Sequence, residues 1–176
     1  MNDGLVLTPA RAKELIDELE RRLVARGIRG SIRIVGGAAM VLRFPDDPEV
    51  RVTTDVDPAY EPRPEIDVVI AEMARDYRLP DRWMNGSSTP WNVVTDTGST
   101  ITVATAEELV AMKMAAGRVQ DLADLRILAR HLGITQPEQL VDIAYAVYGE
   151  DSAALSDSPE SYELLARDVL ADRRRG

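Results

Sequence analysis

Residues 31–57 of the chain read SIRIVGGAAMVLRFPDDPEVRVTTDVD, and this stretch decides the fold that we expect for the protein. Its first five residues alternate in polarity, which predicts a short β-strand over residues 31–35. Two glycines break the strand, and the apolar run after them predicts a short helix. A turn follows at Pro-Asp-Asp-Pro, and the β-branched residues of 50–56 predict a second strand. This order of elements indicates the α+β class.

Helices are expected on both sides of this stretch. Apolar residues recur at helical spacing after Thr8, and Gly27 is a stop signal, so a first helix is predicted between them. Residues 58–64 are expected to form a loop, and 65–77 an amphipathic helix. The other expected strands are 91–94 and 99–103. Together these elements predict a small mixed sheet flanked by helices over residues 1–104.

The last part of the chain, residues 105–176, is predicted to be helical. The Thr105 hydroxyl and Glu108, three residues later, form a capping-box pattern that starts a helix. That helix either ends near Gly117 or continues past it to His131. The further expected helices are 137–148 and 159–173.

The composition excludes several classes of site. The 176 residues include no cysteine and a single histidine, which excludes disulfides, thiolate metal sites and sites built from several imidazoles. With 21 Lys and Arg against 30 Asp and Glu, the net charge of −9 argues against binding nucleic acid by bulk attraction. No apolar run approaches the roughly 20 residues of a membrane helix, and no signal peptide is evident, so a cytoplasmic protein with no membrane partner is expected.

The sharpest local feature is the sequence Thr53-Thr-Asp55-Val-Asp57. On a strand, residues two apart point to the same face, so both carboxylates and the Thr53 hydroxyl would aim in parallel. Mg²⁺ prefers one or two carboxylates together with phosphate oxygens and water. The pair therefore predicts a magnesium site for phosphoryl or nucleotidyl transfer. The alternative is a solvated turn before Pro58.

The second feature is the pair Gly36-Gly37, placed where the first strand meets the short helix. Free N–H groups and the positive dipole end make a helix N-terminus a phosphate site, and glycine allows a close approach. The alternative is a tight strand-to-helix turn without a ligand.

The third feature is Lys113, the only lysine after Lys13. On a continuous helix, Asp121 lies about 80° and Asp124 about 20° around the axis from it. A lysine fixed beside an apolar stripe suits a point charge for a phosphate. The alternative is a solvated lysine with two surface aspartates.

Taken in order, these motifs resemble those of the AbiEii/MenT-type nucleotidyltransferases, the toxin halves of bacterial two-gene toxin–antitoxin pairs. The resemblance covers roughly residues 30–132. The motifs that carry it are Gly36-Gly37, Arg51-x-Thr53-x-Asp55-Val-Asp57 and Glu108-Leu-x-x-x-Lys113-x-x-Ala-x-Arg118-x-x-Asp121-x-x-Asp124.

The resemblance implies a DNA polymerase β-like nucleotidyltransferase fold. It also implies transfer of a nucleoside monophosphate from a nucleoside triphosphate to the 3′ end of tRNA, with a cognate antitoxin as partner. Mg²⁺ would be held by Asp55 and Asp57, with Thr53 beside the metal. One of Asp121 and Asp124 would match the family's late acidic residue. The implied triphosphate contacts are Gly36, Gly37, Arg51 and Lys113.

The chain departs from the wider pattern at two points. The usual Gly-Ser pair lacks its serine, because the serine position holds either Gly37 or Ala38, and no third strand carboxylate is obvious. The nearest candidates for that carboxylate are Asp96 and Thr102. Two alternatives follow. One is a degenerate domain that binds a nucleotide or a protein without catalysis, and the other is transfer to a protein or small-molecule hydroxyl.

Overall fold

The computed structural model describes residues 5–86, 100–150 and 152–171. Over these residues the chain forms seven α-helices and a three-stranded sheet, which confirms the α+β class and the small mixed sheet. The chain divides into two compact units, residues 1–104 and 105–176, and each is described by itself. None of the described helices is long and apolar enough to cross a membrane.

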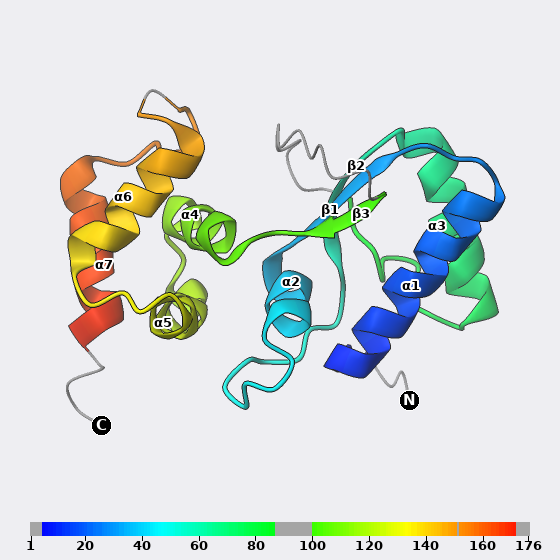
Figure 1. Cartoon of the computed structure of the whole chain (residues 1–176), viewed down its shortest axis with the longest axis horizontal. Coiled ribbons are helices and arrows are strands. Elements are labelled where there is room, and N and C mark those ends of the chain that lie inside the picture. Colours follow the sequence, from blue (N-terminus) through cyan, green and yellow to red (C-terminus); the bar gives the residue numbers. More distant parts are fainter. Residues whose placement is uncertain (1–4, 87–99, 151, 172–176) are drawn as a thin grey trace. The chain divides into compact units, whose positions relative to one another are not determined.

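The first unit is built around a mixed sheet in the order β2-β1-β3 (Figure 1). Strands β1 and β2 are antiparallel, with Val35 opposite Asp57, and β1 and β3 are parallel. The elements of this unit are α1 (Pro9–Ala25), β1 (Ser31–Val35), α2 (Gly36–Arg43), β2 (Asp57–Glu61), α3 (Arg63–Asp76) and β3 (Ile101–Val103).

Helices α1 and α3 pack against each other, and each buries one apolar face in the core of this unit (Figure 1). The Thr8 side chain caps α1 as predicted, and Gly27 follows its end in the left-handed conformation. Every third or fourth residue of each helix is fully buried, because only one face of an amphipathic helix meets the core. The fully buried apolar residues of α1, β1 and α3 are Ala12, Leu15, Leu19, Leu23, Ile32, Ile34, Ile66, Val69 and Met73.

The strand predicted over residues 50–56 is wrong, and so is the loop predicted over 58–64. Strand β2 begins at Asp57 and runs through Pro58, which an edge strand tolerates because its backbone donor is not needed there. The preceding segment forms only two isolated bridges, one from Thr53 to Leu7 and one from Val56 to Met84. Thr53 and Val56 are therefore held by two different parts of the chain, and the segment forms no ladder with any described strand. The strand expected over 91–94 lies outside the described residues.

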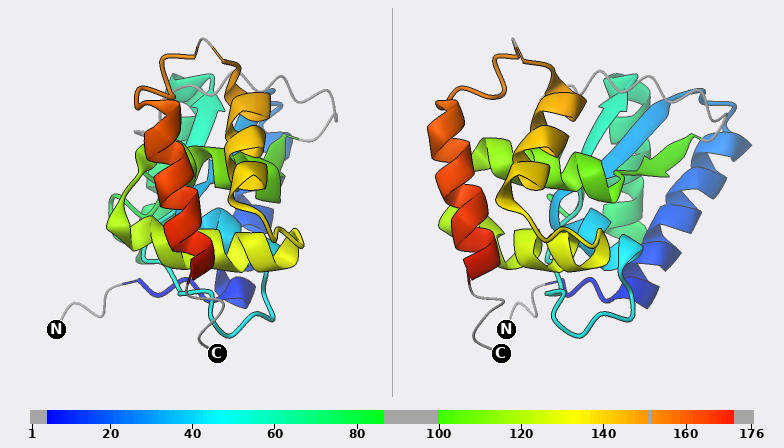
Figure 2. Two further views of the ribbon diagram at one scale, coloured as in Figure 1. Left: turned by 90° about the vertical axis from the view of Figure 1, so that its left-hand side faces the viewer. Right: turned by 60° about the vertical axis from the view of Figure 1, so that its left-hand side comes forward.

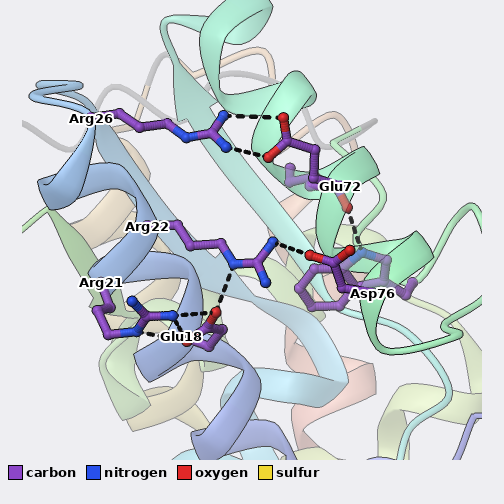
Figure 3. Close-up of polar contacts among 8 residues, drawn as sticks. Glu18, Arg21, Arg22, Arg26, Glu72 and Asp76 are labelled. Carbon is purple, nitrogen blue, oxygen red and sulfur yellow. Dashed lines mark hydrogen bonds and ion pairs between the residues drawn. The ribbon is translucent and has the colours of Figure 1, made fainter.

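An ion-pair network joins the solvent-facing sides of α1 and α3 (Figure 3). The Arg22 guanidinium lies 2.6 Å from a Glu18 oxygen and 2.7 Å from an Asp76 oxygen. One turn later, Arg26 pairs with Glu72. The network links two helices that are far apart in the sequence. Its ion pairs hold α1 and α3 together in addition to their apolar contact.

Removal of the charge of Glu18 is expected to destabilise the first unit at neutral pH only. Hydrogen bonds from Arg22 and then Arg21 lower the pKa of Glu18 below its ordinary value of 4.5. A carboxylate with a lowered pKa stabilises the fold above that ordinary value, and its contribution is lost as the pH falls through the lowered pKa. Glu18→Gln should cost about 0.5–1 kcal/mol near neutral pH and nothing in strong acid. Denaturant unfolding across this range checks the prediction, with the exposed Glu14→Gln as control.

The second unit is helical. It contains α4 (Ala106–Ala116), η1 (Val119–Asp121), α5 (Leu122–His131), α6 (Pro137–Tyr148) and α7 (Pro159–Ala171). Helices α6 and α7 lie side by side, and α4 packs on α6 (Figure 2). The predicted capping box at Thr105 is confirmed.

The extension of α4 past Gly117 to His131, one of two options left open by the sequence, is wrong. Gly117 ends α4 in the left-handed conformation, with φ +57, which is a common helix stop for glycine. A short 3₁₀ turn then leads into α5. Lys113 therefore lies on a different helix from Asp124, and the angles expected for one continuous helix do not apply.

Candidate functional site

The glycine pair lies directly against the acidic motif in the first unit. Gly36 is the first residue of α2 and has φ +64, a conformation that favours glycine. A Cβ atom added at Gly36 would lie 2.8 Å from Oδ2 of Asp57. The N-terminus of α2 and this carboxylate are therefore so close that no side chain fits between them.

The second glycine makes a similar approach to Thr53. A Cβ atom at Gly37 would lie 3.2 Å from both Cβ and Oγ1 of Thr53. The Thr53 hydroxyl lies 3.2 Å from the backbone oxygen and 3.2 Å from Oδ1 of Asp55, in position to donate to either. Five of the sequence-predicted site residues thus converge at one place, namely Gly36, Gly37, Thr53, Asp55 and Asp57.

The single strand predicted for this motif does not bring these residues together. Asp57 begins β2, whereas Asp55 lies in a bend between two bridges, so the two carboxylates do not share the face of one strand. The Leu7 amide donates to the Thr53 carbonyl at 2.8 Å, and the Val56 amide donates to the Trp83 carbonyl at 2.8 Å. Backbone hydrogen bonds from two distant segments therefore fix the bend and bring Thr53 to the glycine turn.

The donor set of this site suits a magnesium–phosphate ligand. Two carboxylates and a hydroxyl are hard oxygen donors, and Mg²⁺ takes one or two carboxylates and completes its shell with phosphate and water. The backbone of α2 offers N–H groups to a phosphate, because the first N–H groups of a helix have no partner within it. The described residues contain no group of three or more metal-ligating side chains, so substrate oxygens and water would supply the other ligands.

The structure does not add Arg51 or a third acidic residue to this cluster. Arg51 is exposed, and it makes no hydrogen bond or ion pair with another described residue. Thr102 lies on β3, and its hydroxyl lies 3.4 Å from the Ile32 carbonyl, at the long end of hydrogen bonding. Asp96 lies outside the described residues.

A second cluster of predicted residues forms in the helical unit around Lys113. Its side chain is only 7% exposed, and its amine lies 2.6 Å from Oδ2 of Asp124 and 3.2 Å from Oδ1 of Asp121. The sequence left open which aspartate matters, and the structure brings both to the lysine. The bend at Gly117 makes this possible, because it folds the start of α5 back towards α4.

Sequence reasoning quoted Arg118 in the motif but gave it no role. Its guanidinium Nε lies 2.7 Å from Oδ2 of Asp121, so it belongs to the same cluster. The spacing of three residues between Arg118 and Asp121 was the available signal, since side chains three apart meet in a helical turn.

No protein-family model, no curated protein and no solved structure matches this chain. The chemistry of the two clusters is therefore interpreted from their own residues.

Alanine at Gly36 is expected to damage the site more than alanine at Gly27. Both glycines have nearly the same positive φ, +64 and +66, but only Gly36 has a neighbour within 4 Å of an added Cβ. Both variants should lose about 1–2 kcal/mol from backbone strain. Gly36→Ala should in addition displace Asp57 and weaken Mg²⁺-dependent nucleotide binding. Denaturant unfolding and calorimetric titration check this, and equal effects of both variants would contradict it.

Proposed function

We propose that this chain is a magnesium-dependent nucleotidyltransferase that transfers a nucleoside monophosphate from a nucleoside triphosphate to the 3′ end of tRNA. The observation that carries the proposal is the contact between the glycine turn of α2 and Asp57, where a Cβ at Gly36 would lie 2.8 Å from Oδ2. A phosphate-binding helix end and a metal-binding carboxylate in direct contact suit a metal-bound triphosphate. The resemblance of the ordered motifs to the AbiEii/MenT-type enzymes supports tRNA as the acceptor and a role as the toxin of a toxin–antitoxin pair.

Each residue of the first cluster has a role in this proposal. The N–H groups of Gly36 and Gly37 would donate to phosphate oxygens, and Asp55 and Asp57 would hold Mg²⁺. The Thr53 hydroxyl would keep Asp55 oriented through their 3.2 Å contact. When bound, Mg²⁺ would polarise the phosphoryl oxygens and lower the pKa of the attacking hydroxyl.

Without a cation, the two carboxylates would repel a triphosphate at the helix end. Nucleotide binding is therefore expected to depend on Mg²⁺, although α2 offers N–H donors by itself. Arg51, exposed two residues before Thr53, is proposed to add a positive charge for the leaving pyrophosphate.

The role proposed for Lys113 changes with the structure. The sequence predicts a phosphate ligand, but the amine lies against Asp121 and Asp124. We propose that Lys113 positions these two carboxylates. The participation of Lys113, Asp121 and Asp124 in transfer is proposed from the motif resemblance alone.

Incubation of the protein with total tRNA, Mg²⁺ and each α-labelled nucleoside triphosphate tests the proposal. Label on tRNA is expected with the unaltered chain, and it should be absent with Asp55→Ala. Asp46→Ala is the matched control, because Asp46 is exposed in the same unit and has no partner among the described residues. Label on the protein itself would instead indicate a protein hydroxyl as acceptor.

The second candidate is a domain that binds a nucleotide or a partner protein without catalysis. The observation that favours it is that Thr53 faces Gly37, and neither Gly37 nor Ala38 supplies the hydroxyl of the serine in the wider pattern. Mg²⁺-dependent nucleotide binding without transfer to tRNA, protein or a small-molecule hydroxyl would support this candidate over the enzyme.

A further inference from the structure

Asn85 lies beside Asp57 in the candidate site of the first unit. The Val56 amide donates to the Trp83 carbonyl, and the Asn85 amide donates to the Val56 carbonyl, both at 2.8 Å. These two hydrogen bonds form a parallel bridge between Val56 and Met84. The residues that follow the bridged pair, Asp57 and Asn85, are therefore neighbours, since paired segments run about 4.8 Å apart.

The side chain of Asn85 faces away from the core of the unit. Successive residues of an extended segment point to opposite sides. Met84, before Asn85, is buried in the core. Gly86, after it, also faces the core, because a Cβ atom there would lie 2.7 Å from the hydroxyl oxygen of the buried Tyr60. Asn85 lies between these two residues and therefore faces the opposite side.

Asp57 faces away from the core in the same way. It is half-buried, and its chain neighbours Val56 and Pro58 are both buried. On one side Asp57 pairs with Val35 of β1, next to the glycine turn of α2, and on the other side it has Asn85 as its neighbour. The Asp57 carboxylate is therefore flanked by the glycine turn and by the carboxamide of Asn85.

The backbone around Asn85 is fixed, but its carboxamide is not engaged. Trp83 is fully buried, and its indole N–H donates to the Ile70 carbonyl at 3.2 Å. Tyr60, which Gly86 contacts, is held by a hydrogen bond to Asp67. The half-buried carboxamide makes no hydrogen bond with any residue that the structure describes. A polar group that is held in place without a protein partner is preorganised to bind a ligand.

The position and chemistry of this carboxamide suit the sugar of a nucleotide. The phosphates are proposed to bind the N–H groups of α2 and the metal at Asp57. Asn85 lies beyond Asp57, two strand spacings or about 10 Å from β1, where the part of the nucleotide after the phosphates would lie. A neutral carboxamide offers both a donor and an acceptor, and these match a hydroxyl group, which also donates and accepts.

We infer that Asn85 hydrogen-bonds a ribose hydroxyl of the bound nucleotide and makes the site selective for ribonucleoside triphosphates. The inference rests on the proposed function for the presence of a nucleotide. A deoxynucleotide leaves the carboxamide without its partner, and a site built to bind a hydroxyl rejects the analogue that lacks it. Asn85 is thus a specificity-determining residue and takes no part in the transfer step.

The test measures how well the site distinguishes nucleotides with and without each ribose hydroxyl. Calorimetry with Mg²⁺ gives the affinity of the full chain for the four ribonucleoside triphosphates, and for the 2′-deoxy and 3′-deoxy forms of the one that binds most tightly. The unaltered chain should prefer the ribonucleotide over at least one deoxy form by about tenfold, as expected for one hydrogen bond.

Asn85→Ala should remove this preference. It should bind the ribonucleotide about tenfold more weakly, and the discriminated deoxy form within about twofold of the unaltered chain, because that form never made the bond. Gln120→Ala is the control, since Gln120 is an exposed carboxamide without a partner among the described residues. It should keep the full preference.

Denaturant unfolding first establishes that Asn85→Ala is folded, and Asn85→Ser replaces it in the comparison if it is not. The inference is overturned if the unaltered chain binds no nucleotide or shows no preference for the ribonucleotide. It is also overturned if the folded variant loses affinity for the ribonucleotide and the deoxy form equally, or loses none. Failure of the proposed function alone is distinct, because the chain would then keep the ribose preference but transfer no label to tRNA.

Discussion

Asparagine at Asp57 is expected to abolish nucleotidyl transfer while the fold persists. The change keeps the size of the side chain and removes one of the two negative charges proposed to hold Mg²⁺. Loss of a metal-binding charge removes several kcal/mol of transition-state stabilisation, so we expect a decrease in transfer rate of about a thousandfold. Mg²⁺-dependent nucleotide binding, measured by calorimetry, should fall with it.

The same substitution should change stability only slightly. The Asp57 carboxylate lies at the N-terminus of α2, where a negative charge contributes about 0.3–1 kcal/mol through the helix dipole. Asp57→Asn should therefore unfold within about 1 kcal/mol of the unaltered chain. The matched control Asp46→Asn should leave both stability and transfer unchanged. Unaltered nucleotide binding in Asp57→Asn would remove Asp57 from the proposed metal site.

The parts of the fold that local sequence determines were predicted correctly. Strand β1 follows from alternation over five residues, and α2 follows from the glycine pair and the apolar run after it. The starts of α1 and α4 follow from the capping side chains of Thr8 and Thr105. All of these signals act within about one helical turn, so no knowledge of the tertiary structure is needed to recognise them.

The errors occur where distant contacts override local preference. The β-branched residues before Asp57 favour a strand, but only Thr53 and Val56 form bridges, with Leu7 and Met84, and neither partner is evident from the sequence. Strand β2 begins with Asp57 and Pro58, which local rules assign to a turn. Pairing with β1 makes this segment a strand, and it places Asp57 opposite Val35, next to the glycine turn.

The composition of the candidate site could be predicted, but its geometry could not. The glycines, Thr53 and the two aspartates were selected by residue type and spacing, and the structure brings them together. The predicted arrangement, in which Asp55 and Asp57 lie on one face of a single strand, is wrong. For the helical cluster, the left-handed Gly117 replaces a continuous helix with a bend, and the bend brings both aspartates to Lys113.

The substitution Lys113→Met is expected to destabilise the helical unit strongly. It keeps the apolar length of the side chain and removes the cation between Asp121 and Asp124, which are 5% and 21% exposed. Two negative carboxylates then lie close together without the positive charge of the lysine between them. Removing one partner of a buried ion pair costs about 3–5 kcal/mol. Denaturant unfolding measures this loss. Lys13→Met is the matched control, because the other lysine is 70% exposed, and it should cost no more than about 0.5 kcal/mol.

A double substitution separates the structural role of this cluster from a role in the reaction. Lys113→Met combined with Asp124→Leu removes the cation and its nearer carboxylate, while Asp121 keeps its contact with Arg118. Since an apolar pair can replace a buried ion pair at little cost, the double variant should regain more than half of the stability lost by Lys113→Met. If the cluster takes part in transfer, the refolded double variant stays at least about a hundredfold less active than the unaltered chain, because its positioned charges are gone. Full activity in a stable double variant would instead limit Lys113 and Asp124 to holding α4 and α5 together.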